Sequence, residues 1–201
     1  MLLQTPTMMT AIALLLAYLI ASVSVSVLYS RSKGSDVRTV DFAGASGMGR
    51  RFGWRVGVAI AIADILKGAL AAGVVLILEP TAIWFAPAIV ALGHCYPVWH
   101  GFNGGQGLSP GTGALWIADP LTGSITFVSG LGTMALHRLY KLERFVKLTA
   151  QPFGGIVGLA ITYFVARGRA GEIAGWGVAL LGAVLLIRGL QVLLSLKPGS
   201  S

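Results

Sequence analysis

The chain has few charged residues and a single cysteine. Only 11% of its 201 residues are Asp, Glu, Lys or Arg, whereas 55% are hydrophobic. A soluble domain usually contains about 25% charged residues, so this composition excludes a protein that packs all its apolar side chains into one aqueous core. It indicates an all-α, polytopic integral membrane protein. The lone Cys95 excludes an internal disulfide and a metal site built from several cysteines.

Acidic residues are also scarce, with 7 Asp and Glu against 15 Lys and Arg and a net charge of +8. A basic excess favours nucleic acid, anionic lipid or an anionic substrate as partner. Nucleic acid is excluded here, because most of the chain is needed for apolar spans.

No Lys or Arg precedes Arg31, which argues against a cleaved secretory signal and favours a retained first span. Metal ligands do not cluster, and we expect no metal site.

The apolar segments predict about seven transmembrane helices in a single domain over residues 1–201. We place them at residues 8–29, 55–78, 82–92, two arms of 108–133 that turn near Asp119, 153–166, and 173–186 with an extension to 196.

Basic residues are distributed unevenly when these spans alternate across the membrane. One side receives only Arg167 and Arg169. The other side receives Arg31, Lys33, Arg38, Arg50, Arg51, Arg55, His137, Arg138, Lys141, Arg144, Lys147 and Lys197. The positive-inside rule therefore places the second side in the cytoplasm.

The segment 93–107, GHCYPVWHGFNGGQG, puts polar groups and a glycine turn directly after an apolar span. Glycine-rich backbone can offer its N–H groups to an anion, and we expect this of Gly104, Gly105, Gln106 and Gly107. His94 could serve as acid, base or hydrogen-bond donor near neutral pH. The alternative is an ordinary glycine turn between spans, with His94 at the membrane interface.

Two further features are polar. The loop 30–54 combines Arg38, Arg50 and Arg51 with several glycines, which suits either a phosphate or anionic lipid headgroups; composition alone favours the headgroups. Asp64 and Lys67 lie three residues apart inside a predicted span and share one helix face. They either orient a substrate group or form a structural ion pair.

These motifs resemble the signatures of the bacterial membrane acyl-phosphate:glycerol-3-phosphate acyltransferases (PlsY-like enzymes). Segment 93–107 is similar to G-H-x-[FY]-P-V-x-x-x-F-[KN]-G-G-K-G, and its matching residues are Gly93, His94, Tyr96, Pro97, Val98, Phe102, Gly104, Gly105 and Gly107. The loop 30–54 is similar to a first signature through Gly34, Asp36, Val37, Arg38, Gly44, Ala45 and Arg50, with Ser46 in place of Thr. Asp64, Lys67 and Gly68 match the D-x-x-K-G that follows it.

The resemblance implies an enzyme of phospholipid biosynthesis in the inner or plasma membrane, active on the cytoplasmic face and without a cofactor. Acyl phosphate would donate an acyl group to glycerol 3-phosphate, giving lysophosphatidic acid, and membrane lipids would be further partners. The implied catalytic residues are His94, Arg38 and Arg50. The implied substrate-binding residues are Ser46, Gly104, Gly105, Gln106, Gly107, Lys67 and Asp64.

The chain departs from these signatures at several polar positions. Gln106 replaces the Lys of G-G-K-G, and Gly47 replaces an Asn of the first signature. A third signature, near R-H-R-E-N-I-x-R-L, retains only Arg188. An alternative is therefore a non-catalytic relative that binds lipid phosphate or a protein partner through the same face. A small transporter or channel fits less well, because its motifs would interrupt spans at the bilayer midplane.

Overall fold

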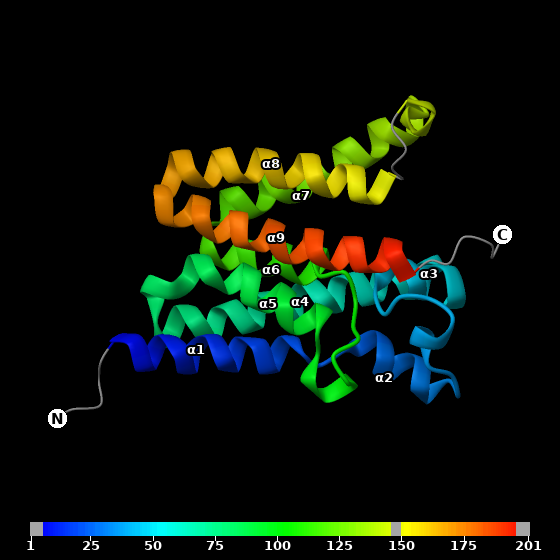
Figure 1. The fold of residues 1–201 in the computed structure, drawn as a ribbon, viewed down its shortest axis with the longest axis horizontal. Helices are drawn as coiled ribbons and strands as arrows, with labels where there is room; N and C mark the ends of the chain where they lie inside the picture. Colours follow the sequence, from blue (N-terminus) through cyan, green and yellow to red (C-terminus); the bar gives the residue numbers. More distant parts are fainter. Residues whose placement is uncertain (1–5, 146–149, 196–201) are drawn as a thin grey trace.

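The computed structural model describes residues 6–145 and 150–195, which form helices joined by loops (Figure 1). The α-helices are α1 (Pro6–Ala21), α2 (Val25–Ser32), α3 (Ala45–Phe52), α4 (Trp54–Leu78), α5 (Ala86–Cys95), α6 (Leu108–Ala118), α7 (Pro120–Leu139), α8 (Ala150–Ala170) and α9 (Glu172–Ser195). Short 3-10 helices are η1 (Val37–Thr39), η2 (Pro80–Phe85), η3 (Val98–His100) and η4 (Leu142–Arg144). The predicted extension of the last span is confirmed as far as Ser195, where α9 ends. Leu196 and two cations of the charge pattern, Lys147 and Lys197, lie outside the described residues.

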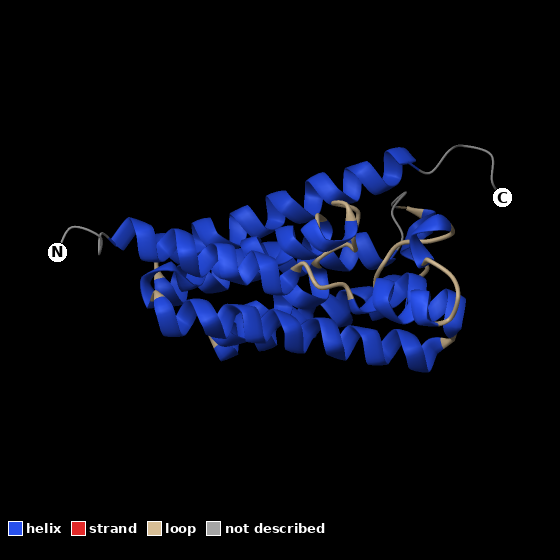
Figure 2. Ribbon diagram, turned by 90° about the horizontal axis from the view of Figure 1, so that it is seen from below, coloured by secondary structure: helices blue, strands red, loops and turns tan. Residues whose placement is uncertain are grey.

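The long helices run along one axis of the molecule (Figures 1 and 2). Helix α4 packs along α6 and against α1, while α7 and α8 pair with each other. Small side chains fill the contacts of the first group, including Ala13, Ala17, Ala71, Ala72 and Ala114. Large apolar side chains point outward instead, among them Leu15, Leu66, Leu70, Ile77 and Leu194. Small residues at helix contacts with large residues outside are typical of bundles surrounded by lipid.

Among the described residues, four segments are long and apolar enough to cross a membrane: Met8–Ser32, Trp54–Leu78, Pro80–His100 and Glu172–Val192. The all-helical membrane class is thus confirmed, but the expected number of about seven spans is not established. Helix α6, for example, has 11 residues and is only about 16 Å long. The predicted turn near Asp119 is confirmed, because the Asp119 carboxylate caps α7 by accepting from the N–H of Thr122 at 3.1 Å.

The first span was predicted as one helix, and that was wrong. Helix α1 ends at Ala21 and α2 begins at Val25. Ser24 caps α2, since its hydroxyl accepts from the N–H of Val27, and serine side chains compete in this way with continued helix. The break survives in an apolar setting because distant side chains satisfy its backbone. The carbonyl of Val23 accepts from Lys67 Nζ at 2.8 Å, and the N–H of Ser24 donates to His100 Nε2 at 3.2 Å.

The two ends of the bundle differ. Helices α2 and α3 and the C-terminal end of α9 lie at one end, and the α8–α9 turn lies at the opposite end (Figure 1). At that opposite end Arg169 Nε pairs with the Asp119 carboxylate at 2.9 Å. The guanidinium of Arg169 lowers the pKa of Asp119 to about 2, so this carboxylate is ionised at any ordinary pH. The loops that carry the signature residues therefore share one end of the molecule.

Candidate functional site

The glycine turn folds back onto the end of α5. The N–H of Gly104 donates to the carbonyl of Cys95 at 3.0 Å, and that of Gly105 donates to the carbonyl of His94 at 3.1 Å. Two of the four N–H groups that were expected to face an anion are therefore used inside the chain. The turn acts as a rigid wall rather than as an open cradle of donors.

Gly105 lies at the closest approach between this turn and its neighbours. A Cβ at this position would come within 2.1 Å of His94 Nε2 and 2.2 Å of the carbonyl oxygen of Ala43. Only glycine fits between an imidazole on one side and a backbone carbonyl on the other. The glycine is thus explained by packing, which fixes the turn against α5 and against the segment that precedes α3.

His94, Asp64 and Lys67 form a buried cluster behind the turn. Lys67 Nζ lies 3.2 Å from the Asp64 carboxylate and 3.1 Å from His94 Nδ1. Because a lysine ammonium only donates, Nδ1 of His94 accepts and the imidazole proton resides on Nε2. All three side chains are buried, and none of them lines the cavity described below. They can position the turn, but they do not reach a substrate there.

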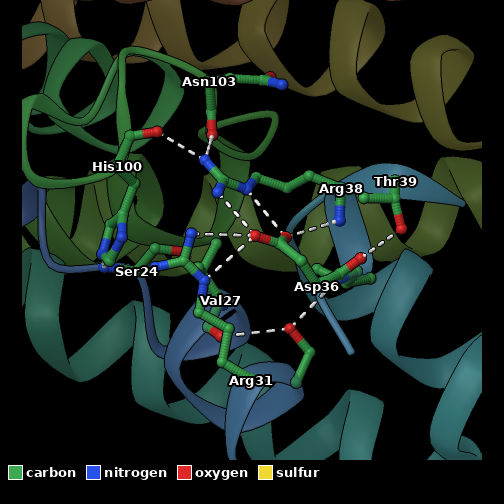
Figure 3. A network of polar contacts seen from close by, with 10 residues as sticks. Ser24, Val27, Arg31, Asp36, Arg38, Thr39, His100 and Asn103 are labelled. Carbon is green, nitrogen blue, oxygen red and sulfur yellow. Dashed lines mark hydrogen bonds and ion pairs between the residues drawn. The ribbon is translucent and has the colours of Figure 1, made fainter. Parts of the chain in front are cut away.

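Arg38 is held by a network at the start of the first polar loop (Figure 3). Its guanidinium forms a bidentate pair with Asp36, with bonds of 2.9 and 2.7 Å. Its Nη1 donates to the carbonyls of His100 and Asn103 at 2.5 and 3.1 Å. Arg31 also bonds Asp36, at 3.1 Å. Arg38, followed by Arg31, holds the pKa of Asp36 well below its usual range, so Arg38 joins the first loop to the glycine turn through ionic contacts.

A polar cavity of about 360 Å³ opens beside this junction. Three segments that are distant in sequence surround it: the loop before α3, the glycine turn and the C-terminal part of α9. Its lining residues are Arg38, Asp41, Phe42, Ala43, Asn103, Gly104, Arg188, Gln191 and Val192. The structure thus brings Arg38 and Gly104 of the predicted site together around one space.

The remaining predicted residues do not line the cavity. Arg50 bonds both oxygens of Asp41, at 2.8 and 2.6 Å, and thereby lowers the pKa of that lining carboxylate. Ser46 is half-buried on α3, and Gln106 and Gly107 continue the turn toward α6. Arg50 can therefore act on the cavity through Asp41.

Arg188 on α9 is the residue that the sequence-based site missed. It is only 9% exposed. Its Nε donates to the carbonyl of Gly105 at 3.0 Å, and its Nη2 donates to the Gly104 carbonyl at 2.7 Å and to Asn103 Oδ1 at 3.0 Å. The guanidinium also lies over the ring of Tyr96, 5.6 Å from its centroid. The sequence did contain a signal for Arg188, because it lies inside a predicted apolar span. An arginine in such a span is energetically costly and usually functional.

A second, apolar cavity of about 100 Å³ lies between α4, α6, α7 and α8. Its walls include Ile65, Leu108, Phe127, Leu131 and Leu159. Within residues 6–145 and 150–195, no group of His, Cys, Asp and Glu is arranged to hold a metal ion. The expectation of a reaction without metal or cofactor stays a prediction.

Comparison with known proteins assigns the chain to a family. Residues 11–194 match the family model for glycerol-3-phosphate acyltransferase. The glycerol-3-phosphate acyltransferase 2 of Deinococcus radiodurans is 39% identical over 184 residues, which cover 88% of this chain and 94% of the relative. A glycerol-3-phosphate acyltransferase of Thermus thermophilus is 36% identical over 132 residues, which cover 62% of this chain and 65% of the relative.

The fold is also found in a solved structure. PlsY (YgiH), described as an integral membrane glycerol 3-phosphate acyltransferase and solved in its glycerol 3-phosphate form, superimposes with a TM-score of 0.74 at 22% identity, covering 93% of this chain and 91% of PlsY. The comparisons do not support the alternative of a non-catalytic relative. The chain belongs to the glycerol-3-phosphate acyltransferase family of integral membrane proteins.

Proposed function

We propose that the protein transfers an acyl group from acyl phosphate to the 1-hydroxyl of glycerol 3-phosphate. The observation that supports this most is the polar cavity of about 360 Å³, where Arg38 of the first signature meets Gly104 of the second and Arg188 of α9. Both substrates carry a phosphate, and arginine is the side chain best suited to bind one. The cavity lies at the end of the bundle that holds α3 and the C-terminal end of α9.

The reaction needs positioning and charge stabilisation more than covalent chemistry by the protein. The 1-hydroxyl oxygen bonds to the acyl carbon, the bond from that carbon to the phosphate oxygen breaks, and inorganic phosphate leaves with its electron pair. The hydroxyl proton leaves with the phosphate or passes to solvent. A cation beside the leaving phosphate stabilises this change, and fixed geometry lowers the entropic cost of bringing two substrates together.

The predicted residues take different parts in this scheme. Arg38 lines the cavity, where its guanidinium, paired with Asp36, fixes the glycine turn beside the substrate phosphate. Arg50 acts through Asp41, and His94 acts through Gly105, which packs against the His94 imidazole. Lys67 and Asp64 hold His94 in place from behind. These roles make His94 and Arg50 positioning residues.

The acyl chain and the membrane face complete the proposal. The apolar cavity between α4, α6, α7 and α8 is lined by Leu108 and Ser109. These two residues begin α6 and directly follow the glycine turn in the chain. We place part of the acyl chain in this cavity. We place the polar cavity at the cytoplasmic face of the inner or plasma membrane, because the basic residues gather at its end of the bundle.

The decisive test supplies the purified full-length protein, in detergent or liposomes, with acyl phosphate and glycerol 3-phosphate. We expect release of inorganic phosphate and formation of lysophosphatidic acid. His94→Ala should lower turnover at least tenfold, because the turn loses the imidazole against which Gly105 packs. No turnover by the wild-type protein, together with retained binding of either substrate, would contradict the proposed reaction.

A further inference from the structure

The end of α7 and the short helix η4 form a basic segment that the proposed reaction does not use. We call residues 136–145 the α7–η4 elbow. Its sequence holds three cations, Arg138, Lys141 and Arg144, against one carboxylate. All three cations are exposed. Among the side chains that the structure describes, none forms an ion pair with them, so their charge is available to an anionic partner.

Large apolar side chains of the same elbow are exposed as well. Leu139 is 72% exposed, Tyr140 65% and Phe145 82%. Exposed apolar groups that lie together usually mark a contact with a partner or with a membrane. No residue of the elbow lines the polar cavity or the apolar cavity. The elbow is therefore a separate surface in which cations and apolar groups alternate.

Two local features turn these side chains outward. The imidazole of His137 is buried, and its ring lies 5.1 Å from the ring of Phe153 on α8, which fixes the last turn of α7 against α8. Lys141 has a left-handed φ of 51° and directs the chain into η4, which packs mainly on α7. Figure 1 shows this end of α7 standing apart from the core of the bundle.

The length of α7 sets the level of the elbow in a bilayer. The helix starts beside Asp119, at the end of the bundle opposite α3, and runs along the bundle axis (Figures 1 and 2). It has 20 residues and is therefore about 30 Å long, which is the thickness of a hydrocarbon core. Its last turn lies where hydrocarbon gives way to headgroups, the level at which tyrosine and basic residues are enriched.

We propose that the α7–η4 elbow binds the headgroups of anionic phospholipids through Arg138, Lys141 and Arg144, while its exposed apolar side chains enter the bilayer interface. Cations close to a membrane surface attract anionic lipid, and amphipathic segments with aromatic groups bind in the interface. Lipid is favoured over a soluble protein partner, because at this level the apolar side chains are already covered by the bilayer. The proposal goes beyond the acyl transfer and does not depend on it.

A fluorophore on the elbow can measure which lipid lies against it. Leu139→Cys provides an exposed thiol for the label, and the native Cys95 is buried. The labelled full-length protein is placed in phosphatidylcholine vesicles that contain either brominated phosphatidylglycerol or brominated phosphatidylcholine, whose bromine atoms quench the label on contact. We expect phosphatidylglycerol to be preferred about fivefold or more, the effect of a single cation near the surface. The preference should shrink in about 1 M salt, where the Debye length is about 3 Å.

Replacing the three cations of the elbow by glutamine tests their role. In the labelled protein, the triple variant should lower the preference for phosphatidylglycerol to about one, because no cation remains to attract the headgroup. Each single substitution should give an intermediate value, which keeps the test informative if the triple variant folds poorly. The substitutions are Arg138→Gln, Lys141→Gln and Arg144→Gln.

A matched control removes three other exposed cations near the same end of the bundle. Its substitutions are Lys33→Gln, Arg51→Gln and Arg55→Gln. The net charge falls by the same amount as in the elbow variant, but the elbow keeps its cations, so the preference measured at position 139 should stay within about twofold of its original value.

The result that would overturn the proposal takes three forms. Equal quenching by the two brominated lipids means that the elbow does not select anionic headgroups. Little quenching by either lipid means that the elbow lies away from the bilayer, as a site for a protein partner would. An equal loss of preference in the elbow variant and in the control means that only the net charge matters. None of these measurements needs turnover, so failure of the proposal and failure of the proposed reaction are distinguishable.

Discussion

At Gly105, packing alone accounts for the glycine that the second signature requires. A Cβ there would meet His94 Nε2 at 2.1 Å and the Ala43 carbonyl oxygen at 2.2 Å. Neither atom can yield easily, because the imidazole is held by Lys67 at 3.1 Å and a carbonyl belongs to the backbone. The glycine turn is therefore in close contact with the end of α5 and with the segment before α3. The spacing of residues in the sequence could not reveal this contact.

Gly105→Ala should cost about 1–3 kcal/mol of stability, as overpacking usually does, and should lower turnover because the turn moves. Gly44→Ala is the control: a Cβ at Gly44 meets nothing within 4 Å, and its φ of 170° is ordinary extended backbone. Thermal unfolding in detergent, with turnover measured on the same samples, checks both. Equal Tm values for the two variants would contradict the packing explanation.

At the scale of elements, the broken first span depends on a residue of another helix. Lys67 on α4 donates to the Val23 carbonyl at 2.8 Å, in the gap between α1 and α2. It also pairs with Asp64 at 3.2 Å. One ammonium group thus satisfies an exposed backbone carbonyl of the break and compensates a buried carboxylate, so helices α1, α2, α4 and α5 meet at it.

Lys67→Met should be strongly destabilising, by about 3–5 kcal/mol, because it leaves the Asp64 carboxylate buried without a partner. The double variant Asp64→Asn with Lys67→Met should recover part of this loss, since no buried charge remains unpaired. Thermal unfolding of the two variants and the wild type measures the difference. A double variant that is no more stable than Lys67→Met would show that the Val23 carbonyl, rather than the ion pair, dominates.

At the scale of the whole molecule, the two ends of the bundle are chemically distinct. The polar cavity, the basic loops and α3 share one end, and the ion pair of Arg169 with Asp119 stabilises the other. We propose that this difference sets the orientation in the membrane, with the basic end on the cytoplasmic side. The single domain over residues 1–201 stays a prediction of the sequence.

Labelling with a membrane-impermeant maleimide tests the orientation. Lys33→Cys and Ala170→Cys place thiols at exposed positions in the loop before η1 and at the end of α8. We expect Ala170→Cys to react in intact cells and Lys33→Cys only in inverted membrane vesicles. The native Cys95 is buried and should give little background. The opposite pattern would place the polar cavity on the external face.

The sequence by itself determined the membrane class, most helix positions, the turn at Asp119 and the family. These depend on local properties: the length of apolar runs, a capping aspartate, and signature residues close together in the chain. It also located Arg38, which lines the cavity, and it favoured a phosphate substrate through the resemblance.

Only the tertiary structure decided which cation is available. Arg38 and Arg50 are neutralised by Asp36 and Asp41, whereas Arg188 reaches back over more than 80 residues to the glycine turn and has no carboxylate partner within the described residues. The break after α1 was likewise hidden, because its support comes from Lys67 and His100. The physical reason is the same in each case: pairing, burial and donor orientation depend on contacts between distant segments, and these exist only once the helices have packed.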